Sequence, residues 1–152
     1  MDVTYFLPVL YAFVACLGFG GLYNLHGRPI FWAAVGGALG WLAYLLTLLF
    51  APDLFAGFVS AAVVAFYAEV LARLQKRTVT TYLLIGIIPM VPGAGIYHTM
   101  EYCIQGNTAL FIEEGLHTLG MAGALAIGIL VVESTWRMIR QMQRRREHAS
   151  SR

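Results

Sequence analysis

Long uncharged runs divide the sequence, and every basic residue lies in a short segment between or after them. The run over residues 30–50 contains no charged side chain. A helix of this length rises about 30 Å, at about 1.5 Å per residue, which matches the hydrocarbon core of a bilayer. The chain of 152 residues is 59% hydrophobic and only 12% charged, about half the charged fraction of a typical soluble domain.

A soluble domain of this size still leaves about a third of its surface in water. The core of a soluble domain of this size is too small to bury so much apolar surface. This disfavours a soluble enzyme, a disordered chain and a secreted disulfide scaffold. In a bilayer, helices satisfy their own backbone hydrogen bonds. The sequence therefore predicts an all-α integral membrane protein.

The apolar runs predict five transmembrane helices within one domain, residues 1–136. The expected spans are residues 4–23, 30–50, 54–72, 79–104 and 115–136, followed by a basic tail over 137–152. The N-terminal region that would be basic in a cleaved leader contains no basic residue. Asp2, Tyr5 and Phe6 occupy it instead. We interpret the first span as a retained helix and not as a cleaved leader.

The basic residues predict the orientation of these spans. They follow spans one, three and five, at Arg28, at Arg73, Lys76 and Arg77, and at Arg137, Arg140, Arg144, Arg145, Arg146 and Arg152. Because cytoplasmic loops are enriched in lysine and arginine, we expect the N-terminus outside and the C-terminus in the cytoplasm, in the inner or plasma membrane of the cell. A re-entrant fourth segment would give an even span count and would place the basic tail outside.

The basic tail is expected to continue the last span as a helix. Arg137, Arg140 and Arg144 share one helix face, which favours contact with anionic lipid headgroups. Nucleic-acid binding is disfavoured because no recognition module accompanies the tail.

No metal, cofactor or enzymatic activity is predicted. Cys16 and Cys103 have no metal-ligand spacing and are expected to be small buried hydrophobes. The motif Glu114-x-x-His117 is half of a di-iron carboxylate motif, which needs two such halves and further carboxylates.

The fourth run is interrupted by Pro89, Pro92, Gly93 and Gly95. Each proline removes a backbone donor and clashes with the preceding turn, and glycine accepts dihedrals that other residues avoid. We therefore expect no regular helix through 89–95. Residues 79–88 rise roughly 15 Å, so the break should lie near the bilayer midplane.

A broken helix at this depth is typical of the substrate sites of secondary transporters. A second half-helix is expected to begin near Gly95, with its N–H groups and positive dipole end available to a carboxylate. Tyr97, His98 and Thr99 in its first turn would add hydrogen bonds. The predicted substrate-binding residues are Pro89, Pro92, Gly93, Gly95, Tyr97, His98 and Thr99. The alternative is a structural kink, for which one proline suffices.

Three titratable side chains within the spans are candidates for proton coupling. His98 and Glu101 are three residues apart on one helix face, and a carboxylate helps an imidazole to stay protonated near neutral pH. A simple hydrogen-bonded pair at the outer mouth is the alternative. Glu69 is a lesser candidate, because it precedes Arg73 by four residues in the orientation that favours an ion pair.

The segment Pro89-Met90-Val91-Pro92-Gly93, followed by Tyr97, resembles a motif of the threonine/serine exporter family, in its small C-terminal-type subunit. Residues 18–24, Gly-Phe-Gly-Gly-Leu-Tyr-Asn, which lead to Pro29, are similar to the family's first helix and turn. Residues 66–73, Phe-Tyr-Ala-Glu-Val-Leu-Ala-Arg, are similar to the segment before its fourth helix.

This resemblance implies a five-helix subunit and a larger companion with a soluble region and five helices of its own. Because an odd number of spans reverses the ends across the membrane, a companion that begins inside would have the opposite orientation, and we expect a 5+5 inverted-repeat transporter. The resemblance implies efflux of threonine and serine, or of a dicarboxylate such as succinate. We therefore expect a subunit of a secondary-active exporter of small carboxylate-bearing metabolites, driven by an ion gradient, with protons as the expected ion. The alternatives are a non-transporting membrane scaffold or regulatory subunit and, least favoured, a membrane-embedded enzyme.

Overall fold

The computed structural model describes residues 6–25 and 27–150, and their side chains as far as Met142. This part of the chain consists of helices and turns without strands, in agreement with the all-α prediction. The elements in order are α1 (Leu7–Leu22), α2 (Arg28–Leu48), α3 (Asp53–Leu74), α4 (Val79–Ile87), the 3₁₀ turn η2 (Ile88–Met90), α5 (Gly93–Ile104) and α6 (Thr108–Ser150). The first residues of the first predicted span, residue 152 and the side chains of Arg144, Arg145 and Arg146 lie outside the described residues.

Three helices are long and apolar enough to cross a bilayer, namely α2, α3 and α6. A fourth span arises if α4 with η2 and α5 are counted together, as a pair bent by 48°. Helix α1 has 16 residues, about 24 Å of rise, and falls short of this length. Helix lengths therefore support three or four spans in the described residues, and the count of five stays a prediction.

Three helix ends share one capping geometry. After α1, α3 and α5 the chain turns through a residue with positive φ, at Asn24 (58°), Lys76 (52°) and Gly106 (72°). At each end the N–H group of the next residue reaches back to a carbonyl in the last helical turn, as Leu25 does to Gly20 at 3.0 Å. This is the Schellman motif, which satisfies carbonyls that a helix end leaves free.

Small residues allow close packing inside the bundle formed by α1–α4. A methyl group added at Gly37 would overlap the sulfur of Cys16, and one added at Gly40 would overlap Val64. Cys16 is fully buried, as expected. Cys103 was expected to be buried too, which is wrong: it is exposed, because α5 packs along α6 and buries none of its own residues.

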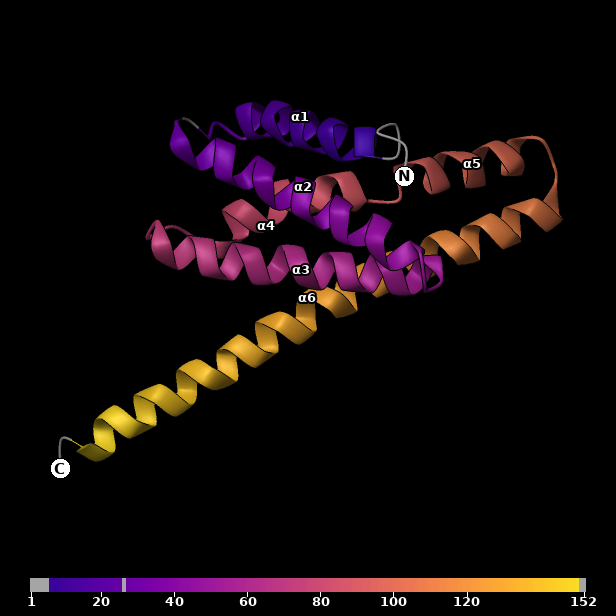
Figure 1. Ribbon diagram of the computed structural model, residues 1–152. Coiled ribbons are helices and arrows are strands. Elements are labelled where there is room, and N and C mark those ends of the chain that lie inside the picture. The colour runs from indigo at the N-terminus through magenta and orange to yellow at the C-terminus, as the bar shows by residue number, and fades with distance from the viewer. Residues whose placement is uncertain (1–5, 26, 151–152) are drawn as a thin grey trace.

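Helices α5 and α6 form a hairpin that projects beyond the bundle, and α6 then crosses α3 and continues past it to the C-terminus (Figure 1). Helix α6 has 43 residues and starts seven residues before the predicted span. The side chain of Asn107 caps it by accepting a hydrogen bond from the Leu110 N–H at 3.3 Å. Hydropathy alone placed the start later, because Glu113 and Glu114 interrupt the apolar run.

Candidate functional site

The predicted interruption of the fourth apolar run is present, but it is shorter than expected. Val91 is extended (φ −60°, ψ 128°), as the residue before a proline prefers, and Pro92 precedes the first residue of α5. The second half-helix begins at Gly93 and not near Gly95. Neither Gly93 nor Gly95 has a positive φ, since Gly27 and Gly106 are the positive-φ glycines of the described chain.

The break is fixed at a definite level of the bundle. The Ser60 hydroxyl donates to the carbonyl of Gly40 at 2.9 Å and contacts the Met90 sulfur at 3.0 Å. Gly40 precedes the end of α2 by eight residues, and Ser60 follows the start of α3 by seven. The break therefore lies about 10–12 Å along these helices from their linked ends.

A cavity of about 350 Å³ lies beside the break. Its lining comes from the break itself, from the first turn of α5 and from α2, α3 and α6. The lining residues are Trp41, Tyr44, Gly57, Pro89, Met90, Val91, Pro92, Gly93, Ala94, Gly95, Glu114, His117, Thr118, Met121 and Leu125. Proteins use concave, mostly apolar cavities of this size, with a few polar groups, to bind small molecules.

Two buried polar atoms of this lining have no hydrogen-bond partner among the described residues, Trp41 Nε1 and Thr118 Oγ1. Thr118 is only 8% exposed, and its hydroxyl lies so close to Gly95 that a methyl group there would overlap it. Native proteins pair nearly all of their buried polar groups, because an unpaired one costs about 1–3 kcal/mol. Both atoms belong to residues that line the cavity, but each has less than 1 Å² of accessible surface, so a polar ligand would pair with them after a small shift of the lining.

The first turn of α5 adds unused donors to the same cavity. The N–H groups of Gly93 and Ile96 donate to the carbonyls of Val91 and Pro92, at 2.7 and 3.1 Å. Among the described residues, the N–H groups of Ala94 and Gly95 have no backbone acceptor. Together with the positive end of the helix dipole, they favour an anion.

A polar network stands at the rim of the cavity. Asp53, in the first turn of α3, accepts a hydrogen bond from the Tyr44 hydroxyl of α2 and an ion pair from His117 Nε2 of α6, the latter at 2.9 Å. A carboxylate in the first turn of a helix is also stabilised by the helix dipole. This network ties three helices together at one point.

The structure separates the predicted substrate-binding residues into two groups. Pro89, Pro92, Gly93 and Gly95 line the cavity, whereas the others belong to the outer part of α5. Tyr97 is 65% exposed, and the Thr99 hydroxyl donates to the carbonyl of Gly95 within its own helix at 2.7 Å.

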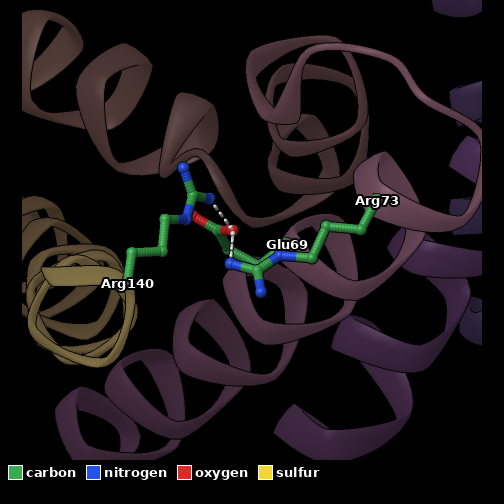
Figure 2. A network of polar contacts seen from close by, with 3 residues as sticks. All are labelled: Glu69, Arg73 and Arg140. Atoms are coloured by element: carbon green, nitrogen blue, oxygen red, sulfur yellow. Dashed lines mark hydrogen bonds and ion pairs between the residues drawn. The ribbon is translucent and has the colours of Figure 1, made fainter. Parts of the chain in front are cut away.

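Of the predicted coupling residues, His98 and Glu101 contact each other at 3.1 Å on the exposed surface of α5, outside the cavity lining. Glu69 lies at the opposite end of α3, where Figure 2 shows its carboxylate between two arginines. Its Oε2 atom is 3.2 Å from Arg73 and 2.7 Å from Arg140 of α6. The expected Arg73 pair is therefore present, and Arg140 adds a tie between α3 and α6.

The sequence did not indicate Trp41, Tyr44 or Thr118 as residues of this site. It also did not indicate that Asp53 and His117 form a pair. A weak signal existed, because His117 and Thr118 are adjacent polar residues within the last apolar run. In the described part of the chain no group of three or more His, Cys, Asp or Glu side chains is suited to hold a metal ion.

Comparisons with known proteins extend over most of the chain. An uncharacterised protein of Haemophilus influenzae is 27% identical over 130 residues, which cover 80% of this chain and 44% of that protein. The chain thus spans less than half of that relative's length. No solved structure matches it. The family described as "Threonine/Serine exporter, ThrE" matches residues 8–135. The apolar helices of this chain and the family match indicate a membrane protein of a transporter family. The chain belongs to the threonine/serine exporter family.

Proposed function

We propose that this chain is a subunit of a secondary-active exporter of small carboxylate-bearing metabolites, such as threonine, serine or succinate, and that the cavity at the helix break holds the substrate carboxylate. The observation that carries the proposal is the convergence of unused donors on one cavity. These are the Thr118 hydroxyl, the Trp41 indole N–H and the N–H groups at the start of α5.

The chemistry of these donors suits transport. A carboxylate has two oxygens that accept hydrogen bonds from several neutral donors at once. Helix N-termini bind anions without a full positive charge, whereas a buried arginine would hold a carboxylate in a stronger, bidentate pair. A site built from neutral donors binds weakly enough for the substrate to be released on the other side.

A larger companion of the same family is part of this proposal. The matched relative has more than half of its length outside the aligned region, so relatives of this chain carry further segments beside the one described here. We propose that the companion contributes a second five-helix half of opposite orientation and completes the substrate site at the interface of the two halves.

The proposed orientation places the N-terminus outside and the extension of α6 in the cytoplasm. Helix α6 continues past the bundle. Arg137, together with the part of Arg140 that its pair with Glu69 leaves exposed, would meet anionic lipid headgroups at the membrane surface. The ion pairs of Glu69 with Arg73 and Arg140, which we call the Glu69 clamp, would then lie near the cytoplasmic face. The cavity would lie nearer the outer face.

Efflux of labelled threonine, serine and succinate tests the proposal, in cells that lack the family and express this chain, its companion or both. We expect efflux only when both are present. Trp41→Phe should reduce efflux, because it removes an indole donor while keeping an aromatic ring. The same efflux from the companion alone would instead support a scaffold or regulatory role for this chain.

A further inference from the structure

The ion pair between His117 and Asp53 lies where the α5–α6 hairpin leaves the bundle. From Gly120 onward α6 packs on α3, since a methyl group at Gly120 would meet Leu54 at 3.3 Å. His117 lies almost one helical turn before this contact, on the side of the hairpin. Among the described side chains, the other ion pair between α3 and α6 joins Glu69 and Arg140, more than 30 Å away along α6.

The same pair stands at the mouth of the cavity. His117 and Glu114 line the cavity from α6, and Tyr44 lines it from α2 while donating to Asp53. The His117 and Asp53 side chains are 50% and 34% exposed. Asp53 is the first residue of α3, next to the turn from α2, so we expect water and protons to reach the pair from this end of the bundle. Separation of this pair would let the start of α6 move away from the break together with α5, which packs mainly against α6.

We infer that His117 is a proton-binding latch: its imidazolium pairs with Asp53 to hold the α5–α6 hairpin over the cavity, and loss of the proton loosens the mouth. The inference deepens the proposed function, because the cavity it controls is the proposed substrate site. It gives a proton a direct effect on access to that site through residues other than the coupling candidates expected from the sequence.

Histidine ordinarily changes charge between pH 5 and 8, whereas carboxyl groups and tyrosine ordinarily titrate outside this range. The titratable groups around His117 are Asp53 from α3, Tyr44 from α2 and Glu114 one turn earlier on α6. The adjacent helix α5 adds the pair of His98 and Glu101, which bind each other. Histidine is therefore the residue type at the mouth that can change charge in this range, and loss of the imidazole proton would remove the charge that His117 brings to its pair with Asp53.

Labelling of an engineered thiol in the cavity tests the latch without any substrate. Met121 lines the cavity and is buried, so we choose Met121→Cys as the reporter. Cys103 is exposed on α5 and serves as an internal reference, while Cys16 is fully buried. N-ethylmaleimide is applied to open membrane fragments at pH 6 and pH 8, and the labelling of the two positions is compared by peptide mass spectrometry.

The ratio of reporter to reference labelling should rise about two- to fivefold from pH 6 to pH 8, the range that a half-exposed ion pair supports. His117→Gln and Asp53→Asn should remove this pH dependence and leave the ratio high. His117→Lys, which stays charged, should keep it low at both pH values. His98→Gln is the matched control, since it removes the other histidine–carboxylate pair, and it should retain the response.

A pH-independent ratio in the parent protein, or a response that survives in His117→Gln, would overturn the latch. If Asp53→Asn does not accumulate, the contrast between His117→Gln and His117→Lys decides the question. Because labelling needs no substrate, a failed latch leaves the efflux result standing. Absent efflux leaves the labelling result equally intact, so the two proposals fail separately.

Discussion

Replacing Thr118 by valine should change stability and transport in opposite directions. Valine has the shape of threonine but replaces the hydroxyl by a methyl group. The Thr118 hydroxyl is buried and lacks a partner among the described residues, so it carries a desolvation penalty of about 1–3 kcal/mol. We therefore expect Thr118→Val to stabilise the protein by about 1 kcal/mol.

Transport should fall in the same variant, because the substrate carboxylate loses one donor. A net hydrogen bond to a charged group contributes about 1.5–3 kcal/mol, which corresponds to a loss of roughly 10- to 150-fold in affinity. Denaturant unfolding of purified protein measures the stability, and the concentration dependence of efflux measures the affinity. Thr118→Ser keeps the hydroxyl and should retain most of the affinity. A Thr118→Val variant that is clearly destabilised, or that transports like the parent, would refute the reasoning.

Two further predictions concern the close packing at Gly95 and the Glu69 clamp. Gly95→Ala should impair efflux, because its methyl group would overlap the Thr118 hydroxyl. Gly93→Ala should be tolerated, because a methyl group there meets nothing within 4 Å. Equal effects of the two substitutions in efflux assays would contradict this prediction. Glu69→Gln should lower the free energy of unfolding by about 1–2 kcal/mol, since it removes the buried carboxylate shared by Arg73 and Arg140 while both arginines stay partly exposed. Thermal and denaturant unfolding check this value, and an unchanged midpoint would show that the clamp does not stabilise the fold.

The helices could largely be predicted from the sequence because apolar runs and helix breakers act locally. Helix α2 begins and ends two residues before the predicted span, since Pro29 is accepted in its first turn. Pro89 and Pro92 predicted the break, because a missing donor and a ring clash need no tertiary information. The second half-helix was expected to begin near Gly95 but begins at Gly93, because glycine permits unusual φ values without requiring them.

The candidate site could be predicted only in part, because it depends on contacts across the bundle. Trp41 lies about fifty residues before the break, and no local pattern connects the two. Gly95 was chosen for its backbone freedom, yet it is needed because the Thr118 side chain of another helix lies against it. The outer part of α5 was included with the break because they adjoin in sequence, although Tyr97 is exposed and does not line the cavity.

Competition between a substrate and its uncharged amide shows whether the donors at the helix break hold a carboxylate. The complex of this chain with its companion is purified, and binding of labelled succinate and threonine is measured against unlabelled succinate, succinamide, threonine and threoninamide. If the carboxylate is held by the donors at the helix break, each acid should compete at least about tenfold better than its amide, and Thr118→Val should reduce this difference. Equal competition by acid and amide would contradict the account.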